Sequence, residues 1–333
     1  MKKKNIMCVI IAMMCTIGIL GGCGKEEASV QMLTISSEPD KIVYEEGEMF
    51  DATGVVIDAK MSDGSTEKNI NYNCKQKEKL TTKDTSVVFT YGGKTVMQKI
   101  TVEPKGNNEK YSVANYETLS ESPLSGKTYF WLGSSVTEGY GACDESMVDY
   151  IEKKYSAICI KEAVSGTTLA DAESTKNVGD SYVKRLDQYM DSEDAAEKLD
   201  AFICQLSTND ANGTVELGNM TDTNIKDKTS FDTTTTYGAI EYIIARVREK
   251  YNCPIIFYTN SKYNNETYGD MVETLCEMAD KWDITVINLY DDESFNNISD
   301  DELALYMKDA IHPTRAGYSL WWLPKFEEVL LNL

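Results

Sequence analysis

The chain has 333 residues, and its 33 lysines and arginines against 54 aspartates and glutamates give a formal net charge of −21 at pH 7. Such an acidic surface repels phosphate backbones, and the sequence has no long basic run, so nucleic acid is excluded as an expected partner. The length predicts about two domains, each large enough to bury its own core.

The N-terminus is typical of an exported protein. Three lysines at positions 2–4 precede an apolar stretch over residues 8–20, which is followed by two glycines and Cys23. The stretch is shorter than the ~20 residues that a membrane-spanning helix needs, so it indicates a signal peptide over residues 1–22. Its end resembles a bacterial lipobox, which implies an extracytoplasmic lipoprotein anchored in the cell membrane through Cys23. The alternative is an ordinary signal peptide that is cut nearby, with Cys23 incidental.

The cysteines give no sign of a metal site. Six of them follow Cys23, none forms a Cys-x-x-Cys pair, and no histidine lies near enough in sequence to suggest a zinc knuckle. Several lie in or beside apolar runs, which favours buried thiols, although an exported protein can also pair some of them. We therefore expect no metal site.

Residues 33–103 follow a short polar spacer over residues 23–32 and are predicted to form strands separated by turns. Gly92 and Gly93 stand between two β-branched or aromatic runs, which predicts a tight hairpin. The segment resembles the bacterial immunoglobulin-like repeats of surface proteins, which implies a small all-β sandwich. Such a module is a spacer or contacts carbohydrate or the cell wall, and both interpretations stay open. The strand candidates are QMLTIS, GVVIDAK, TSVVFTY and KTVMQKITV.

Residues 104–126 are predicted to be a linker, because they begin with the polar stretch PKGNNEK. From residue 127 to residue 333, apolar runs alternate with helical patterns. An amphipathic helix is predicted over residues 237–251, with Glu241 near its start and basic residues near its end, as the helix dipole favours. The apolar runs are KTYFWLG, SAICIKEA, DAFICQLS, CPIIFYTN and DITVINLY.

The continuous apolarity of these runs suits strands that are covered on both faces. Strands that alternate with helices predict an α/β fold with a doubly wound parallel sheet. In that fold the reactive groups gather at the carboxyl ends of the strands. A polar, threonine-rich segment over residues 211–238 is long enough to be a functional loop and is a candidate lid.

Short polar motifs follow three of the predicted strands, and a fourth lies near the C-terminus. They are LGSSVTEGYG, AVSGTTLAD, QLSTNDANG and DAIHPT. In this order and at these places, the motifs resemble the four blocks of the SGNH/GDSL hydrolases, over roughly residues 127–333. The resemblance implies the flavodoxin-like form of the doubly wound sheet and a serine esterase activity that needs no cofactor.

The resemblance also implies roles for five residues. Ser135 matches the nucleophile, His312 the base, and Asp309 the acid that orients the base. The oxyanion hole is matched by the N–H groups of Ser135 and Gly166 and by the side-chain amide of Asn209.

The chain departs from the family pattern in two blocks. Ser134 stands where the first block usually has aspartate, and Ser207 and Thr208 stand where the third often has glycine. Ser134 leaves two adjacent serines as candidate nucleophiles, of which the alignment favours Ser135.

The residue types suit this chemistry independently of the resemblance. A serine hydroxyl needs an adjacent base to attack a carbonyl at neutral pH, and His312 is the only histidine in the chain. A carboxylate on the other ring nitrogen holds the imidazole in one tautomer, and Asp309 is placed to do so. N–H donors stabilise the oxygen that becomes charged in the tetrahedral intermediate.

We therefore predict a surface-anchored serine esterase. Its expected substrates are O-acetyl groups of polysaccharide or cell-wall glycan, an inference that depends on the predicted location and the family. One alternative is a lipase or thioesterase for longer acyl chains. Another is a carbohydrate-binding or adhesive surface protein with an inactive hydrolase scaffold.

Overall fold

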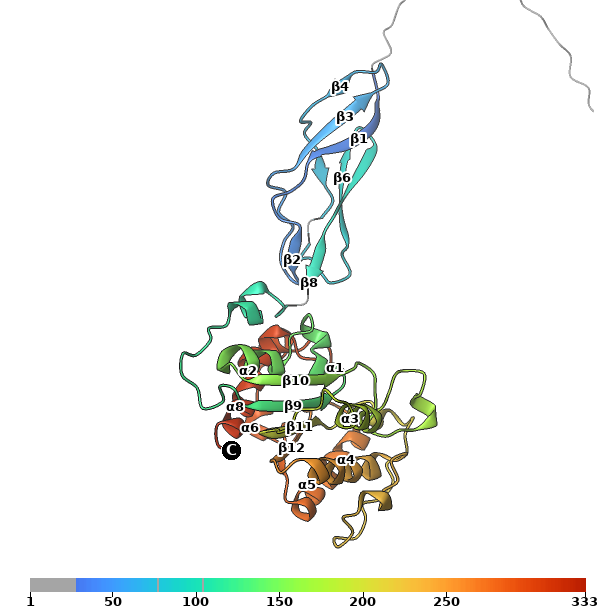
Figure 1. Cartoon of the computed structure of the whole chain (residues 1–333). Coiled ribbons are helices and arrows are strands. Elements are labelled where there is room, and N and C mark those ends of the chain that lie inside the picture. The colour runs from blue at the N-terminus through green and yellow to red at the C-terminus, as the bar shows by residue number, and fades with distance from the viewer. Residues whose placement is uncertain (1–27, 77, 104) are drawn as a thin grey trace, which may run out of the picture.

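The computed structural model describes residues 28–333 except Lys77 and Pro104. Two folded parts follow one another along the chain (Figure 1). The predicted signal peptide and the predicted anchor Cys23 lie outside the described residues.

The N-terminal part is made of short strands around a small apolar core that includes Tyr44, Ile57 and Phe89. β1 pairs antiparallel with β3 and β3 with β4; β5, β6 and β7 form an antiparallel sheet, and β2 pairs with β8 in parallel. The strands are β1 (Val30–Ser37), β2 (Val43–Glu45), β3 (Val56–Met61), β4 (Thr66–Glu67), β5 (Asn73–Cys74), β6 (Ser86–Tyr91), β7 (Lys94–Lys99) and β8 (Thr101–Glu103).

The predicted hairpin joins β6 and β7. Tyr91 pairs with Lys94, so the turn consists of Gly92 and Gly93, whose φ angles are 52° and 77°. A two-residue turn of type I′ needs a positive φ at both positions, which glycine adopts without strain. The hairpin and its neighbours are compatible with a small β domain, and its immunoglobulin type stays a prediction.

The C-terminal part is an α/β unit with a five-stranded parallel sheet, which confirms the predicted fold class. The strand order is β10-β9-β11-β12-β13, the order of a flavodoxin-like doubly wound sheet. Each predicted apolar run supplies one strand: β9 (Thr128–Gly133), β10 (Ile158–Ala163), β11 (Ala201–Gln205), β12 (Ile255–Tyr258) and β13 (Thr285–Ile287).

Helices cover both faces of this sheet (Figure 1). Phe130 and Phe202 pack among residues of α3, α4 and α5, whereas Trp131 and Ile203 pack among residues of α2 and α8. The α-helices are α1 (Ser135–Glu138), α2 (Met147–Tyr155), α3 (Tyr182–Met190), α4 (Thr236–Lys250), α5 (Glu266–Trp282), α6 (Glu293–Asn296), α7 (Asp300–Tyr306) and α8 (Leu323–Leu330); a π-helix (Gly317–Trp322) runs into α8.

α4 confirms the helix predicted over residues 237–251, but Glu241 is not a surface charge near its start. Its carboxylate is buried, forms an ion pair with Lys281, and accepts hydrogen bonds from Thr221 and from the Trp282 indole. A buried carboxylate needs such partners. Glu241 therefore ties the loop around Thr221 to α4 and α5.

Among the described residues, no helix combines the length and the apolar character that crossing a bilayer requires. The six cysteines that follow Cys23 are all described, and each has a free thiol.

Candidate active site

Ser135 lies at the carboxyl end of β9, the position where this fold gathers reactive groups. It is the first residue of α1, so its backbone N–H lies in the first helical turn and has no acceptor within the helix. β9 ends at Gly133, where an added Cβ would collide with the side chain of Thr137. The strand can therefore turn sharply into the helix and present Ser135 at the end of the sheet.

The side chains of Ser135, His312 and Asp309 form a continuous hydrogen-bonded chain. The Ser135 Oγ lies 2.8 Å from the His312 Nε2, and the His312 Nδ1 lies 2.9 Å from each carboxylate oxygen of Asp309. This is the arrangement in which an imidazole removes a proton from a serine while a carboxylate holds the ring.

Asp309 is held in its ionised form. Its Oδ1 accepts hydrogen bonds of 2.8 Å from the backbone N–H groups of Ile311 and His312. Partial burial opposes ionisation, but the hydrogen bonds from the His312 ring and from these N–H groups outweigh it and lower the pKa of Asp309 to about 2.

The two adjacent serines have different surroundings. Ser134 is fully buried, and its hydroxyl, whose neighbour is the buried Tyr182 hydroxyl, forms no hydrogen bond of ordinary length within the described part of the chain. Its backbone N–H donates to the Gln205 Oε1 at the end of β11. Only Ser135 of the pair contacts His312, so the geometry favours Ser135 as the nucleophile.

Gly166 lies in a tight turn over residues 164–167, after β10. Its φ of 81° is the positive angle that the third residue of a type II turn needs, and the Thr167 N–H closes the turn on the Val164 carbonyl. The Glu138 carboxylate, at the end of α1, accepts hydrogen bonds from the backbone N–H and the hydroxyl of Ser165. The helix that begins with Ser135 therefore also holds the turn that contains Gly166.

The buried guanidinium of Arg185, on α3, is also bonded to this turn. It donates 2.8 Å hydrogen bonds to the carbonyls of Gly133 and Glu162, and a longer one to the Thr167 hydroxyl. Since Gly133 and Glu162 lie at the ends of β9 and β10, Arg185 joins both strand ends to the turn.

Asn209 follows β11, and its side-chain amide donates a 2.8 Å hydrogen bond to the Thr167 carbonyl, which leaves its second N–H free for another acceptor. The next residue, Asp210, is fully buried and accepts hydrogen bonds from the backbone N–H groups of Leu169 and Ala170. Burial raises the pKa of Asp210 to about 6, although these hydrogen bonds partly offset it. The loops after β10 and β11 are thus bonded directly to each other.

A cavity of about 220 Å³ lies where these loops meet. It brings together four of the five residues selected from the sequence, and Asp309 lies behind His312 rather than on the cavity wall. The predicted lid does not contribute, because no residue between 211 and 238 lines this cavity and Thr221 is bonded to Glu241 instead. The lining residues are Ser135, Tyr140, Ser165, Gly166, Thr208, Asn209, Ile311 and His312.

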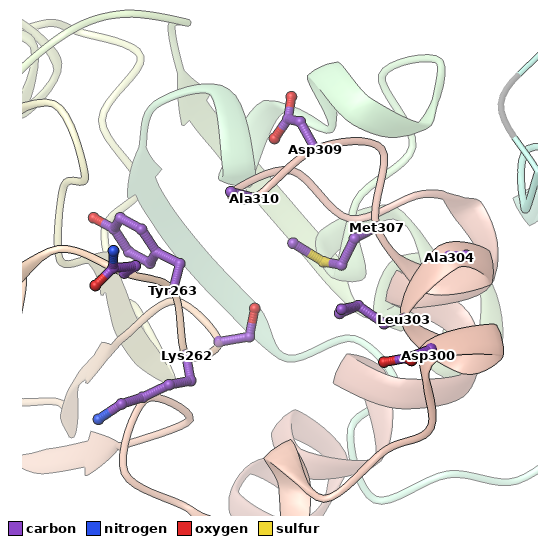
Figure 2. A pocket seen from close by; sticks show the side chains of 10 residues that line it. Lys262, Tyr263, Asp300, Leu303, Ala304, Met307, Asp309 and Ala310 are labelled. Atoms are coloured by element: carbon purple, nitrogen blue, oxygen red, sulfur yellow. The ribbon is translucent and has the colours of Figure 1, made fainter.

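A second cavity, of about 430 Å³, is lined by Asp309 and Ala310, which directly precede the residues Ile311 and His312 of the first cavity (Figure 2). Its wall includes Leu303 and Ala304 of α7 and Met307 beyond it, and Tyr263 lies across from them in the segment after β12. Asp309 and Ala310 close its upper end in this view.

Sequence reasoning did not single out Arg185, and Glu138 was included only as a member of the first motif, LGSSVTEGYG. Both act on the backbone around Gly166. Glu138 lies at a fixed spacing from Ser135 in the first block, and this spacing was the one available signal for its role. Arg185 gave no signal, because an arginine on a helix is usually exposed.

A family model described as the GDSL-like lipase/acylhydrolase family matches residues 131–320. No curated protein matches the chain significantly in sequence.

Several solved structures have a similar fold. One is 21% identical, with a TM-score of 0.50 over 64% of this chain and 99% of that chain. A protein from Lactobacillus plantarum is 20% identical, with a TM-score of 0.47 over 62% of this chain and 97% of its own. A single-substitution variant of an acetyl xylan esterase from Geobacillus stearothermophilus is 15% identical, with a TM-score of 0.41 over 61% of this chain and 94% of its own. At these identities the likeness concerns the fold alone.

Proposed function

Because the chain belongs to the GDSL-like lipase/acylhydrolase family, we propose that it is a serine esterase whose catalytic triad is Ser135, His312 and Asp309. One observation carries the proposal: an unbroken hydrogen-bonded chain runs from the Ser135 hydroxyl through His312 to Asp309, at a cavity that Gly166 and Asn209 also line.

In the proposed mechanism the Ser135 Oγ attacks the ester carbonyl while the His312 Nε2 takes its proton. The Asp309 carboxylate accepts a hydrogen bond from the Nδ1–H and stabilises the imidazolium. The carbonyl oxygen gains negative charge, which N–H groups of Ser135, Gly166 and Asn209 stabilise; loss of one such donor typically lowers the rate ~10²–10³-fold. His312 then protonates the leaving alcohol, and a water molecule that it activates releases the acid from Ser135.

The size of the cavity supports a short acyl group. Its volume of about 220 Å³ is below the range of about 300–1,000 Å³ that is usual for pockets that hold drug-sized ligands. Together with the export signal expected at the N-terminus, this supports O-acetyl groups of polysaccharide or cell-wall glycan as the substrate. The glycan itself then remains outside the cavity, and only the acetyl group enters it.

The direct test is acetate release from a panel of acetylated glycans by the wild type and by Ser135→Ala. We expect release by the wild type and none above background by Ser135→Ala, with Ser134→Ala as the matched control at the neighbouring serine. Equal rates for the wild type and Ser135→Ala on p-nitrophenyl acetate would contradict the esterase proposal.

The second cavity favours one other candidate, a lipase or thioesterase for longer acyl chains, because its apolar wall of Leu303, Ala304 and Met307 adjoins the His312 loop (Figure 2). A series of p-nitrophenyl esters from acetate to octanoate separates the two. For an acetylesterase, kcat/KM should fall steeply for esters longer than butyrate. For an enzyme that places a long acyl chain in the second cavity, kcat/KM should rise toward octanoate.

We also propose that the protein is a lipoprotein held at the membrane through a diacylglyceryl group on Cys23, since two acyl chains give a stable anchor. In cells fed labelled palmitate, the wild-type protein should incorporate the label and should be recovered in the membrane fraction after lysis. Cys23→Ala should do neither, and retention of label by this variant would contradict the anchor.

A further inference from the structure

The segment over residues 106–116, hereafter the strap, precedes the residues that the family model matches. It was predicted to be part of a linker because it is polar. In the structure its polar groups bond to the two loops that carry Ser135 and His312. The polar residues of the strap are therefore used for hydrogen bonds to neighbouring loops, and the segment is not a linker without contacts.

Asn107 is the centre of these contacts. It is only 4% exposed, and both ends of its amide are used. Its Nδ2 donates a 2.9 Å hydrogen bond to the carbonyl of Gly141, in the turn that follows α1. Its Oδ1 accepts a 2.9 Å hydrogen bond from the backbone N–H of Arg315, at the start of the helix that follows His312. One buried side chain thus joins residues 135–145, hereafter the nucleophile loop, to residues 309–315, hereafter the base loop.

The two loops also touch each other at this point. A Cβ added at Gly141 would lie 2.9 Å from the Cβ of His312 and would collide with the Pro313 carbonyl. The approach is possible because position 141 is glycine. The position of His312 relative to Ser135 therefore depends on how the backbone at Gly141 is held, and the Gly141 carbonyl is bonded to Asn107.

Neighbouring contacts keep the strap in place. The Gly106 carbonyl accepts a 2.9 Å hydrogen bond from the Ala316 N–H, and a Cβ at Gly106 would collide with the Leu305 carbonyl. Glu145, in the nucleophile loop, accepts hydrogen bonds from the Ser112 hydroxyl, the Val113 N–H and the Arg315 guanidinium. The strap is therefore bonded on both sides of Asn107.

We propose that Asn107 is a positioning residue for the esterase reaction: by joining the Gly141 carbonyl to the Arg315 N–H, it fixes the Nε2 of His312 at hydrogen-bond distance from Ser135. The proposal rests on the proposed function. Asn107 touches neither substrate nor reacting atoms, so it acts on the alignment of the triad and not on the acyl cavity, which it does not line.

This role predicts a specific kinetic pattern for Asn107→Ala in the full chain. With p-nitrophenyl acetate, kcat should fall about 10- to 100-fold while KM changes less than about twofold, because small errors in the alignment of reacting groups lower the chemical step steeply. The second-order rate at which a fluorophosphonate modifies Ser135 should fall by a similar factor, since this reaction also needs an activated serine but no ester substrate.

Asn108→Ala is the matched control, because Asn108 is the adjacent asparagine and its Oδ1 accepts only from the nearby Lys110 N–H. It should behave as the wild type. A second variant, Asn107→Asp, keeps the size and the acceptor for Arg315 but turns an oxygen toward the Gly141 carbonyl. Asn107→Asp should show the same loss of kcat. If Asn107→Ala does not fold, the kcat of Asn107→Asp tests the positioning role in its place.

A folded Asn107→Ala or Asn107→Asp variant with wild-type kcat and wild-type fluorophosphonate reactivity would overturn the positioning role alone. A wild type that neither hydrolyses p-nitrophenyl acetate nor reacts with the fluorophosphonate overturns the proposed function, and the positioning role with it. Circular dichroism and the thermal unfolding midpoint establish which variants are folded under the assay conditions.

Discussion

At the scale of single residues, Ser134 and Ser135 are adjacent in sequence but differ in what surrounds them. The Ser135 hydroxyl lies on the cavity and bonds to His312, whereas the Ser134 hydroxyl is buried and forms no hydrogen bond of ordinary length among the described residues. An unpaired buried hydroxyl is typically destabilising by about 1–3 kcal/mol.

We expect Ser134→Ala to keep wild-type kcat and to unfold at the same or a higher denaturant concentration, because it removes an unpaired polar group from a buried site. Ester hydrolysis and urea unfolding measure the two effects. An inactive Ser134→Ala together with an active Ser135→Ala would show that the nucleophile is Ser134.

Asp309 gives a second prediction at this scale. Asp309→Asn keeps the side-chain size but removes the negative charge and replaces one carboxylate oxygen beside the His312 Nδ1 with an N–H₂ donor, so the ring can take the wrong tautomer and kcat should fall about 10³–10⁴-fold with little change in KM. The pKa of Asp309 is lowered to about 2, so the carboxylate stays ionised through the assay range. Above about pH 4, Asp309 should therefore add no proton to the acid limb of the wild-type kcat/KM profile, whose slope should not exceed one. A slope of two would show that Asp309 takes up a proton in the same range.

At the scale of elements, α1 and the turn over residues 164–167 act as a unit through Glu138. Glu138→Ala removes the acceptor for both donors of Ser165, so the turn that directs the Gly166 N–H becomes less well held. We expect kcat to fall about 10- to 100-fold. This is a smaller loss than the ~10²–10³-fold that removal of one oxyanion donor typically causes, because the Gly166 N–H is still present but is less well directed.

Glu138→Gln is the matched control, because its amide oxygen still accepts from Ser165. It should recover most of the activity that Glu138→Ala loses. If both variants have wild-type kcat on p-nitrophenyl acetate, Glu138 does not hold the turn in the way that its contacts indicate.

The elements also show what the sequence can predict. All five strands of the parallel sheet came from their apolar runs, because burial on both faces leaves a continuous pattern. The loops of Ser135, Gly166 and Asn209 were predicted to converge because parallel strands place their carboxyl ends at one edge. No such rule indicates Arg185 or Asn107, whose partners are backbone groups from other elements. These partners come together only when the chain folds, so the order of residues in the sequence does not indicate these hydrogen bonds.

At the scale of the whole molecule, the buried carboxyl of Asp210 makes stability depend on pH. Its pKa is raised to about 6 in the folded protein from an ordinary value of 3.8, so the folded state binds this proton more tightly than the unfolded state. The resulting stabilisation is complete below about pH 4 and is lost as the pH rises to about 6. The shift corresponds to about 3 kcal/mol.

Comparison with Asp210→Asn isolates this contribution, because every other titrating group is shared. The free energy of unfolding of the wild type minus that of the variant should decrease from pH 4 to pH 6 and then stay level. Urea unfolding at a series of pH values measures it. A difference that rises over this interval would show that ionised Asp210 is favoured by its hydrogen bonds.

The tight contacts at Gly106 and Gly141 limit how the enzyme can diversify. The loops of Ser135 and His312 are packed against each other and against the strap, so an inserted residue or a larger side chain at these contacts would move Ser135 and His312 apart. The side chains of Leu303, Ala304 and Met307 instead line the second cavity, so they can change in size without meeting these contacts (Figure 2). Evolution and protein engineering therefore have a permissive wall at α7, where new substrate preferences can arise without disturbing the chemistry.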